Sequence, residues 1–488
     1  MEKRKKLGLF LGPFLFLLAS FSPLLSQNPR AHKLLAVFLL VITWWVTECI
    51  PIPITALLIP VFLTVFKITT VTEALSPFAN PIIMLFLGSF ILAKAMCVHT
   101  LDQKLAFSVL SLKSVRHSKT RILLAFGLIS LFLSMWISNT ATTAMMYPIA
   151  LGILGSFHQD KNEKGLSFKV ILLLTLAYSA SIGGIGTPIG SPPNLIAIGM
   201  LEKLADIKID FFQWMLIGMV VMIPMFTVLI VFMKHRLKKT GVLNEIPESS
   251  SFQSDEVRTP LNRAQKNVLS AFSITVFLWT FPGIISLILG RSHSWSLWLH
   301  QHIPESTAAL IGAGLLFLLP TDWSRGRFTL TLKQAMNIDW GTLILFGGGL
   351  SLGFQMFESG LADIIGKFFI SLGGQYAGAV VITFVSIAFS VFLTEVTSNT
   401  ASANMIIPII IAISHAASIN PLVPVLGSAI GCSFAFMLPV ATPPNAIIYG
   451  SGMIKLPQMM KVGFWLNIIG IVLIWGCLCL LSFVFPVI

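Results

Sequence analysis

The stretch that decides the fold is SNTATTAMMYPIA at residues 138–150, because a close copy, SNTASANMIIPII, occupies residues 398–410. The Ser-Asn-Thr triplet, the alanine after it and a Pro-Ile pair recur at an offset of 260. Each copy is followed by a second motif, SPPN at residues 191–194 and TPPN at residues 442–445. Polar triplets and double prolines are costly inside apolar sequence. Their duplication predicts that the fold brings these four stretches together.

The composition around these motifs is that of a membrane protein. The chain has 488 residues, of which 55% are hydrophobic and 10% are charged, whereas a soluble domain has about a quarter of its residues charged. The net charge of +13 lies in short loops. It therefore indicates the usual bias of basic residues toward the cytoplasm rather than nucleic-acid binding. The five cysteines lie in or next to apolar segments, and we interpret them as apolar filler.

Apolar stretches of about 20 residues, the length of a membrane span, run along the whole chain. The basic N-terminus resembles a signal peptide, but we expect a retained first span with a cytoplasmic N-terminus. Spans are expected at residues 8–25, 34–48, 54–66, 79–97, 168–200, 211–233, 267–290, 305–320, 340–357, 422–453 and 462–486. The prediction is an all-α polytopic membrane protein with about eleven transmembrane helices and the C-terminus outside.

Two further apolar regions are expected to enter and leave the membrane on the same side. Residues 122–157 carry basic residues at both ends and the polar triplet in the middle, which predicts a re-entrant hairpin opening to the cytoplasm. Residues 375–417 form the corresponding outward hairpin. The spans at 168–200 and 422–453 are interrupted by glycine and proline, so both are expected to be broken helices.

The two halves are expected to form an inverted repeat. Phe86, Gly88 and Met96 recur as Phe346, Gly348 and Met356 in spans that run in opposite directions. We therefore divide the chain into a first repeat with an extra N-terminal helix (1–233), a cytoplasmic linker (234–266) and a second, inverted repeat (267–488). Inverted repeats with broken helices are typical of secondary transporters whose site lies near the membrane midplane.

The residues at the triplets and breaks suit a monovalent cation and an anion. Hydroxyl and amide side chains and freed carbonyls supply neutral oxygens, which suit Na⁺ better than Ca²⁺ or Mg²⁺. Helix N-termini at the same places favour an anion. No Lys or Arg occurs in residues 130–157, 170–200, 374–418 or 422–453. Bound cations and helix dipoles are therefore expected to neutralise the anion, which would couple the two ligands.

These paired motifs and inverted halves resemble the divalent-anion:sodium symporter family over nearly the whole chain. The resemblance implies an elevator-type transporter that forms a homodimer in the plasma (bacterial inner) membrane. It implies cotransport of several Na⁺ ions with a C4-dicarboxylate such as succinate, fumarate or malate, or sometimes citrate or sulfate. The protein is therefore not expected to be an enzyme, and no P-loop or zinc-protease motif is found.

The resemblance also assigns roles to individual residues. One Na⁺ site is implied at Ser134, Ser138, Asn139 and the Gly190 carbonyl, and a second at Thr394, the Thr397 carbonyl, Asn399 and the Ala441 carbonyl. The implied substrate-binding residues are Asn139, Thr140, Ser191, Pro192, Asn399, Thr400, Ser402, Thr442 and Pro443. Relatives that work as sodium-independent exchangers are expected to place a cation in the pocket, and none is expected here.

Several alternatives and single residues remain open at this stage. A sodium-independent dicarboxylate or anion exchanger and an anion channel compete with the symporter. Glu395 is interpreted as a backbone cap rather than a proton sensor, since its counterpart is Met135. Glu48 and Lys94 are expected to extend their charges to the membrane surface. Trp44 and Trp45 are expected as interfacial anchors, and His415 as a packing or surface residue rather than a proton relay.

Overall fold

The computed structural model describes residues 2–23, 25, 27–110, 115, 118–155, 166–239, 260–373 and 378–484. Most of the linker expected at 234–266 and parts of the hairpin flanks lie outside these residues. The described part is almost entirely helical. It contains one small antiparallel pair of strands, β1 (Pro320–Asp322) and β2 (Arg327–Phe328).

The first half of the chain follows the predicted spans closely. Its helices are α1 (Glu2–Phe21), α2 (Pro29–Thr47), α3 (Ile52–Val65), α4 (Val71–Leu75), η1 (Ser76–Ala79), α5 (Pro81–Val98), α6 (Leu101–Leu110), α8 (Lys119–Ser134), α9 (Asn139–Gly155), α10 (Phe168–Gly183), α11 (Pro192–Ala205) and α12 (Phe211–Lys239). The predicted inward hairpin is the pair α8–α9, and the predicted broken span is α10–α11.

The second half repeats this order. Its helices are α13 (Arg263–Leu289), α14 (Ser294–His302), α15 (Glu305–Leu318), α16 (Leu332–Ala335), α17 (Trp340–Glu358), α18 (Leu361–Gly373), α19 (Ala379–Thr394), α20 (Asn399–Ala416), α21 (Leu422–Gly431), α22 (Pro443–Gly450) and α23 (Leu456–Val484). The predicted outward hairpin is α19–α20, and the second broken span is α21–α22. The short helices α6, α14 and α18 were not predicted from the sequence.

Seven helices in the described residues are long and apolar enough to cross a membrane. Of the broken helices and hairpin arms, α10, α19 and α21 are among the shorter apolar helices, whereas the hairpin arm α20 is one of the seven. Proline and polar caps explain where they stop. Pro192 and Pro443 begin the second half-helices, since proline fits the first helical turn but not the interior.

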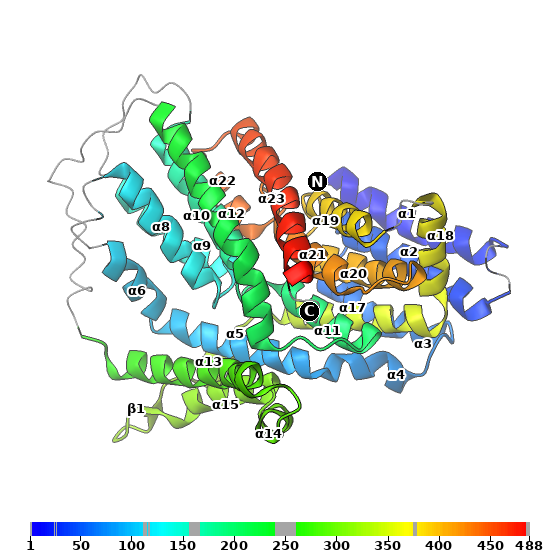
Figure 1. The fold of residues 1–488 in the computed structure, drawn as a ribbon, viewed down its shortest axis with the longest axis horizontal. Coiled ribbons are helices and arrows are strands. Elements are labelled where there is room, and N and C mark those ends of the chain that lie inside the picture. The colour runs from blue at the N-terminus through cyan, green and yellow to red at the C-terminus, as the bar shows by residue number, and fades with distance from the viewer. Residues whose placement is uncertain are drawn as a thin grey trace.

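The repeat is visible in the packing. In the first half α8 packs along α10, and in the second half α19 packs along α21 in the same way. Helix α5 packs along α15, and α17 packs along α3. Figure 1 shows α13 and α15 along one edge of the molecule with α5 beside them, while the long helix α12 runs from beside α13 toward the opposite edge.

Two of the single-residue expectations can be compared with the packing. Trp45 is completely buried, so it cannot serve as the lipid-facing anchor expected from its position near a span end. The reason is that it lies on the face of α2 that packs into the core with α3 and α17. His415 stacks edge-on against Phe357 at 5.9 Å between ring centroids, which agrees with a packing role.

Candidate functional site

The two Ser-Asn-Thr triplets form the tips of the two hairpins, and the tips have the same internal contact. In the first hairpin the Ser134 hydroxyl donates a 2.6 Å hydrogen bond to Asn139 Oδ1. In the second, the Thr394 hydroxyl lies 2.7 Å from Asn399 Oδ1 and donates to it. Both asparagine amides are thereby held in one orientation, with their oxygens turned toward the end of the preceding helix.

The serine of each triplet begins the second helix of its hairpin. Ser138 Oγ accepts a hydrogen bond from the Ala141 amide, and Ser398 Oγ accepts one from the Ala401 amide, both at 3.2 Å. Serine is a favoured residue at this position because its hydroxyl satisfies an otherwise unpaired N–H group. The triplet therefore fixes a helix N-terminus at each tip.

The asparagine of each Pro-Pro-Asn motif holds its break together. Asn194 donates through Nδ2 to the carbonyls of Gly184 (2.9 Å) and Thr187 (2.8 Å). Asn445 donates in the same way to the carbonyl of Ala435 (2.8 Å) and that of Leu438 (3.1 Å). Each amide replaces backbone hydrogen bonds that the interrupted helix cannot make. Both side chains are fully buried.

The two breaks also contact each other. Ser191 and Ser433 lie 2.9 Å apart through their hydroxyl oxygens. The Tyr178 hydroxyl of α10 donates to the Phe436 carbonyl in the second break at 2.7 Å. Segments more than 240 residues apart in the chain are thus joined at the centre of the molecule.

A cavity of about 670 Å³ joins the two tips and the two breaks, and we call it the tip cavity. The residues predicted from the sequence that line it are Ser138, Asn139, Thr140, Gly190, Ser191, Pro192, Asn399, Thr400, Ala441, Thr442 and Pro443. The other predicted residues, Ser134, Thr394, Thr397 and Ser402, are buried behind this wall. Ser402 there contacts the Thr397 hydroxyl rather than the cavity.

Four helices begin at the wall of the tip cavity. Helices α9 and α20 begin at the two tips, and α11 and α22 begin at the two breaks. A helix N-terminus carries partial positive charge and unpaired N–H groups, so it attracts anions. Four such ends at one cavity would suit an anion with more than one negative group.

Oxygen atoms gather behind each tip. A side chain at Gly184 would lie 2.4 Å from Asn139 Oδ1, and one at Gly190 would lie 2.6 Å from the Gly184 carbonyl oxygen and 2.9 Å from that of Ser134. At the second tip, the Thr394 hydroxyl also contacts the Cys432 carbonyl at 2.9 Å. Neutral oxygens at this density suit a small monovalent cation.

Sequence reasoning missed the carbonyls of Gly184 and Cys432. Each belongs to the residue that caps the first half-helix of its break. Every residue has a carbonyl, so residue type gives no signal for it. The available signal is positional, since both lie at the same place in the two repeats.

Glu395 has the structural role predicted for it, although it caps a different segment. Its carboxylate accepts hydrogen bonds from the Phe436 and Met437 amides (2.8 Å each) and from the Leu438 amide (3.0 Å). Asn467 of α23 donates to it as well, at 2.6 Å. Glu395 therefore caps the second break rather than its own hairpin.

The expectation that no cationic side chain reaches the pocket is wrong for the tip cavity as a whole. Lys94 of α5 lines it, as both tips do. The four apolar stretches do lack Lys and Arg, but α5 lies outside them and turns the face with Phe90, Ala93, Lys94 and Cys97 toward the cavity. These residues are spaced as one face of a helix.

A second cavity of about 940 Å³ shares α3, α5, α11 and α17 with the tip cavity but is lined by other residues of these helices. Its wall includes residues 76–81 before and at the start of α5, and Leu350 and Phe354 of α17. At the offset of 260, residues 76–81 correspond to residues 336–341 before and at the start of α17, and Leu350 and Phe354 correspond to Phe90 and Lys94 of α5. Most of these counterparts line the tip cavity. The second cavity is therefore the counterpart of the tip cavity in the inverted repeat.

Taken together, the fold and the site define a class of protein. A multi-pass helical membrane protein with inverted repeats, two broken helices and a central ligand cavity is a secondary transporter, not an enzyme.

Comparisons with known proteins agree with this class. Residues 7–482 match the family described as the sodium:sulfate symporter transmembrane region. The chain is 36% identical over 482 residues to a protein of Staphylococcus saprophyticus named sodium-dependent dicarboxylate transporter SdcS, covering 96% of this chain and 89% of that protein. It is also 36% identical over 490 residues to SdcS of Staphylococcus aureus strain USA300. The chain therefore belongs to the sodium:sulfate symporter family, which confirms the resemblance found in its motifs.

Two solved structures share the fold. The YdaH transporter of Alcanivorax borkumensis aligns with a TM-score of 0.59 at 11% identity, covering 86% of this chain and 89% of that one. MtrF of Neisseria gonorrhoeae aligns with a TM-score of 0.58 at 15% identity, covering 85% and 84%. At these identities the likeness concerns architecture alone, and it confirms the predicted all-helical transporter fold.

Proposed function

We propose that this protein couples the entry of Na⁺ to the uptake of a C4-dicarboxylate such as succinate, fumarate or malate. The observation that carries the proposal is the meeting of four helix N-termini at one cavity, with oxygen-rich pockets directly behind the two tips. Both relatives named above are described as sodium-dependent dicarboxylate transporters. The family description, which refers to sulfate, supports a divalent anion in general.

The residues of the site divide between the two ligands. Ser134, Ser138, Asn139 and the Gly190 carbonyl hold one Na⁺, and Thr394, the Thr397 carbonyl, Asn399 and the Ala441 carbonyl hold another. Thr140 and Thr400, with the starts of α11 and α22, hold the two carboxylates. Each Na⁺ adds positive charge beside an anion-binding tip, so occupation by one ligand raises the affinity for the other.

The packing of the tips supports an alternating-access mechanism of the elevator type. Helix α17 packs against α20 and α11, whereas the corresponding helix α5 has no comparable packing against α9 among the described residues. The tip cavity lies on this open side. Movement of the hairpins and broken helices past α5 and α17 would close it and expose the tips at the second cavity.

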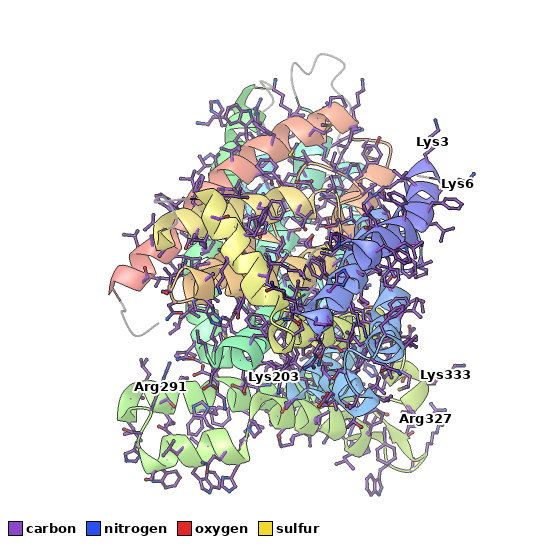
Figure 2. The ribbon with its side chains drawn as sticks, turned by 90° about the vertical axis from the view of Figure 1, so that its right-hand side faces the viewer. Lys3, Lys6, Lys203, Arg291, Arg327 and Lys333 are labelled. Atoms are coloured by element: carbon purple, nitrogen blue, oxygen red, sulfur yellow. The ribbon has the colours of Figure 1, made fainter. Side chains whose placement is uncertain are left out.

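The distribution of basic residues supports an orientation for this movement. Figure 2 shows Lys3, Lys6, Arg327 and Lys333 on one side of the molecule and Arg291 on the opposite side. By the positive-inside rule the first side would be cytoplasmic, which supports an N-terminus inside and a C-terminus outside. The tip cavity then opens to the cytoplasm, because the end of α5 and the start of α17 line it. We also propose a homodimer in the bacterial inner membrane, as in the family that the motifs resemble.

The proposal is tested by uptake of labelled succinate into proteoliposomes with an inward Na⁺ gradient. We expect uphill, saturable uptake that stops when K⁺ replaces Na⁺. Competition by malate, citrate and sulfate at several Na⁺ concentrations then identifies the preferred anion. Uptake that is unchanged without Na⁺ would overturn the coupling.

One observation favours a second candidate, a sodium-independent exchanger. Lys94 supplies a fixed positive charge in the cavity wall, which could replace part of the charge of a bound cation. This candidate predicts that internal succinate stimulates succinate entry in the complete absence of Na⁺. A symporter gives no such stimulation under the same conditions.

A further inference from the structure

Lys94 is placed to contact a ligand rather than a protein group. It is half-buried in the wall of the tip cavity, which both tips also line. Its amine forms no ion pair or hydrogen bond with any residue that the structure describes. A lysine ammonium carries three donors and no acceptor, so a negative ligand is its natural partner.

The carboxylate in the same wall does not take that place. Asp339 caps the start of α17, where its Oδ1 accepts from the Thr342 amide at 3.1 Å and its Oδ2 accepts from the Thr342 hydroxyl at 2.6 Å. Both oxygens are therefore occupied within α17. Among the described residues that line the tip cavity, Lys94 and Asp339 are the charged ones.

The inverted repeat places a different group at the corresponding position of the second cavity. The counterpart of Lys94 at the offset of 260 is Phe354 of α17. The amine of Lys203, from α11, lies 5.0 Å from the centre of the Phe354 ring. Arg30 and Lys67 also line the second cavity, and the Arg30 guanidinium there donates to the Ile68 carbonyl and to Gln355. The position that corresponds to Lys94 is nevertheless Phe354, and the cation beside it belongs to a broken helix.

We propose that Lys94 is a one-sided contact for the substrate anion, formed only while the tips face the tip cavity. This inference rests on the function proposed above. A carboxylate held at the tips pairs with the Lys94 ammonium in the conformation seen here. When the hairpins and broken helices move toward the second cavity, Lys94 stays with α5 and Phe354 takes its place beside the substrate. The two faces of the carrier then bind the same dianion with unequal affinity.

The test uses the full-length protein in right-side-out and inside-out vesicles at saturating Na⁺. Lys94→Met removes the cation from the tip cavity, and Lys203→Met is the matched control in the second cavity. Because a hydrogen bond to a charged group is lost, we expect Lys94→Met to raise the half-saturating succinate concentration about tenfold on one face only. Lys203→Met should leave that face unchanged, and Lys94→Arg should restore most of the affinity.

Three results would overturn the inference. The first is a half-saturating succinate concentration of Lys94→Met that is unchanged on both faces, and the second is an equal rise on both faces. The third is a Lys94→Met variant with normal affinity for succinate while the separately measured Lys94→Arg variant binds poorly. The melting temperature of each purified variant without ligand shows whether it is folded.

A binding measurement separates this inference from the proposed function. The shift in melting temperature caused by succinate or sulfate requires no transport. We expect this shift to be reduced in Lys94→Met and retained in Lys203→Met. If the wild type transports no dianion, the proposed function fails. If succinate or sulfate shifts the melting temperature of Lys94→Met and Lys203→Met equally, the role of Lys94 is rejected, whether or not the wild type transports.

Discussion

The two broken helices are built from the same motif but are stabilised differently. In both, the asparagine after the double proline donates to two carbonyls of the interrupted segment. The first break covers residues 184–191 and the second covers 432–442, so the second is three residues longer. Glu395 accepts three backbone N–H groups of this longer segment, whereas its counterpart Met135 packs against Gly186.

This difference separates residues that form the site from residues that support it. The triplets and the Pro-Pro-Asn motifs are duplicated because both halves contribute equivalent walls to one cavity. The residues behind them need only satisfy the backbone of their own break. A longer break has more unpaired N–H groups, and a buried carboxylate satisfies several of them at once.

The largest effect that tests this comparison is expected at the tips. Asn139→Ala and Asn399→Ala should each lower succinate uptake roughly 100-fold, because each removes a proposed Na⁺ ligand, a cost of about 3 kcal/mol. Asn139→Ala also takes away the partner of the Ser134 hydroxyl, whereas the Thr394 hydroxyl keeps its contact with the Cys432 carbonyl. Initial uptake rates in proteoliposomes measure this. Asn267→Ala is the control, since Asn267 bonds only to Pro320 and Thr329 far from the tips. Normal uptake by either tip variant would show that its half does not form the site.

A smaller effect is expected at the residues that cap the ends of α10 and α21, the first half-helix of each break. Gly184→Ala should raise the half-saturating Na⁺ concentration at least about tenfold, since the new methyl group lies 2.4 Å from Asn139 Oδ1 and such overpacking costs of order 1–3 kcal/mol. Cys432 caps the corresponding half-helix and already carries a side chain there. Cys432→Ala should therefore change the half-saturating Na⁺ concentration by less than about twofold. The dependence of uptake on Na⁺ concentration gives both values. Equal responses would mean that the two oxygen clusters are built alike.

The third test concerns stability rather than transport. Glu395→Ala should lower the free energy of unfolding by about 3 kcal/mol or more, because three amides and the Asn467 side chain lose a charged acceptor. Met135→Ala should cost about 2 kcal/mol through lost packing alone. Thermal unfolding in detergent without ligand compares them. A Glu395 variant no less stable than the Met135 variant would contradict the capping role.

The smallest expected effect lies outside the spans, in α6. Asp102 is buried there, and burial raises the pKa of its carboxyl group, whereas its counterpart in α18 is Ala362. The folded state favours the protonated form of Asp102. The contribution of this carboxyl group to stability is therefore complete below its pKa in the unfolded chain, about 3.9, and is lost as the pH rises through its higher pKa in the folded protein. Asp102→Asn should therefore stabilise the protein by about 1 kcal/mol at neutral pH, and this gain should shrink toward acidic pH. Melting temperatures at several pH values measure the gain, and a gain independent of pH would exclude this origin.

Much of the fold could be predicted because the signals are strong and duplicated. Apolar length located the spans, and the polar triplets and double prolines located the hairpin tips and the breaks. Helices α6, α14 and α18 were missed because they are short and because charged residues or histidines interrupt their apolar runs. The two strands were missed because five residues provide no periodic pattern.

The site was predicted less completely, for reasons of geometry. Side chains in the motifs were found, but backbone oxygens such as that of Cys432 have no signal in the residue type. Lys94 was expected to extend toward the membrane surface, because nothing in a single span shows which helix face borders a cavity. Trp45 was misjudged for the same reason, since its position near a span end does not reveal that it faces the core.

The second cavity has a consequence for inhibition. Neither triplet lines it, and its walls come from α2, α3, α4, η1, the start of α5, α11 and α17. A small molecule lodged there would hold Lys203 against Phe354 and keep the tips on their present side without occupying the substrate position. Such a compound would bind only the conformation described here and would exclude the one that presents the tips at the second cavity, so inhibition from that side would be competitive with the substrate although the two ligands occupy different cavities.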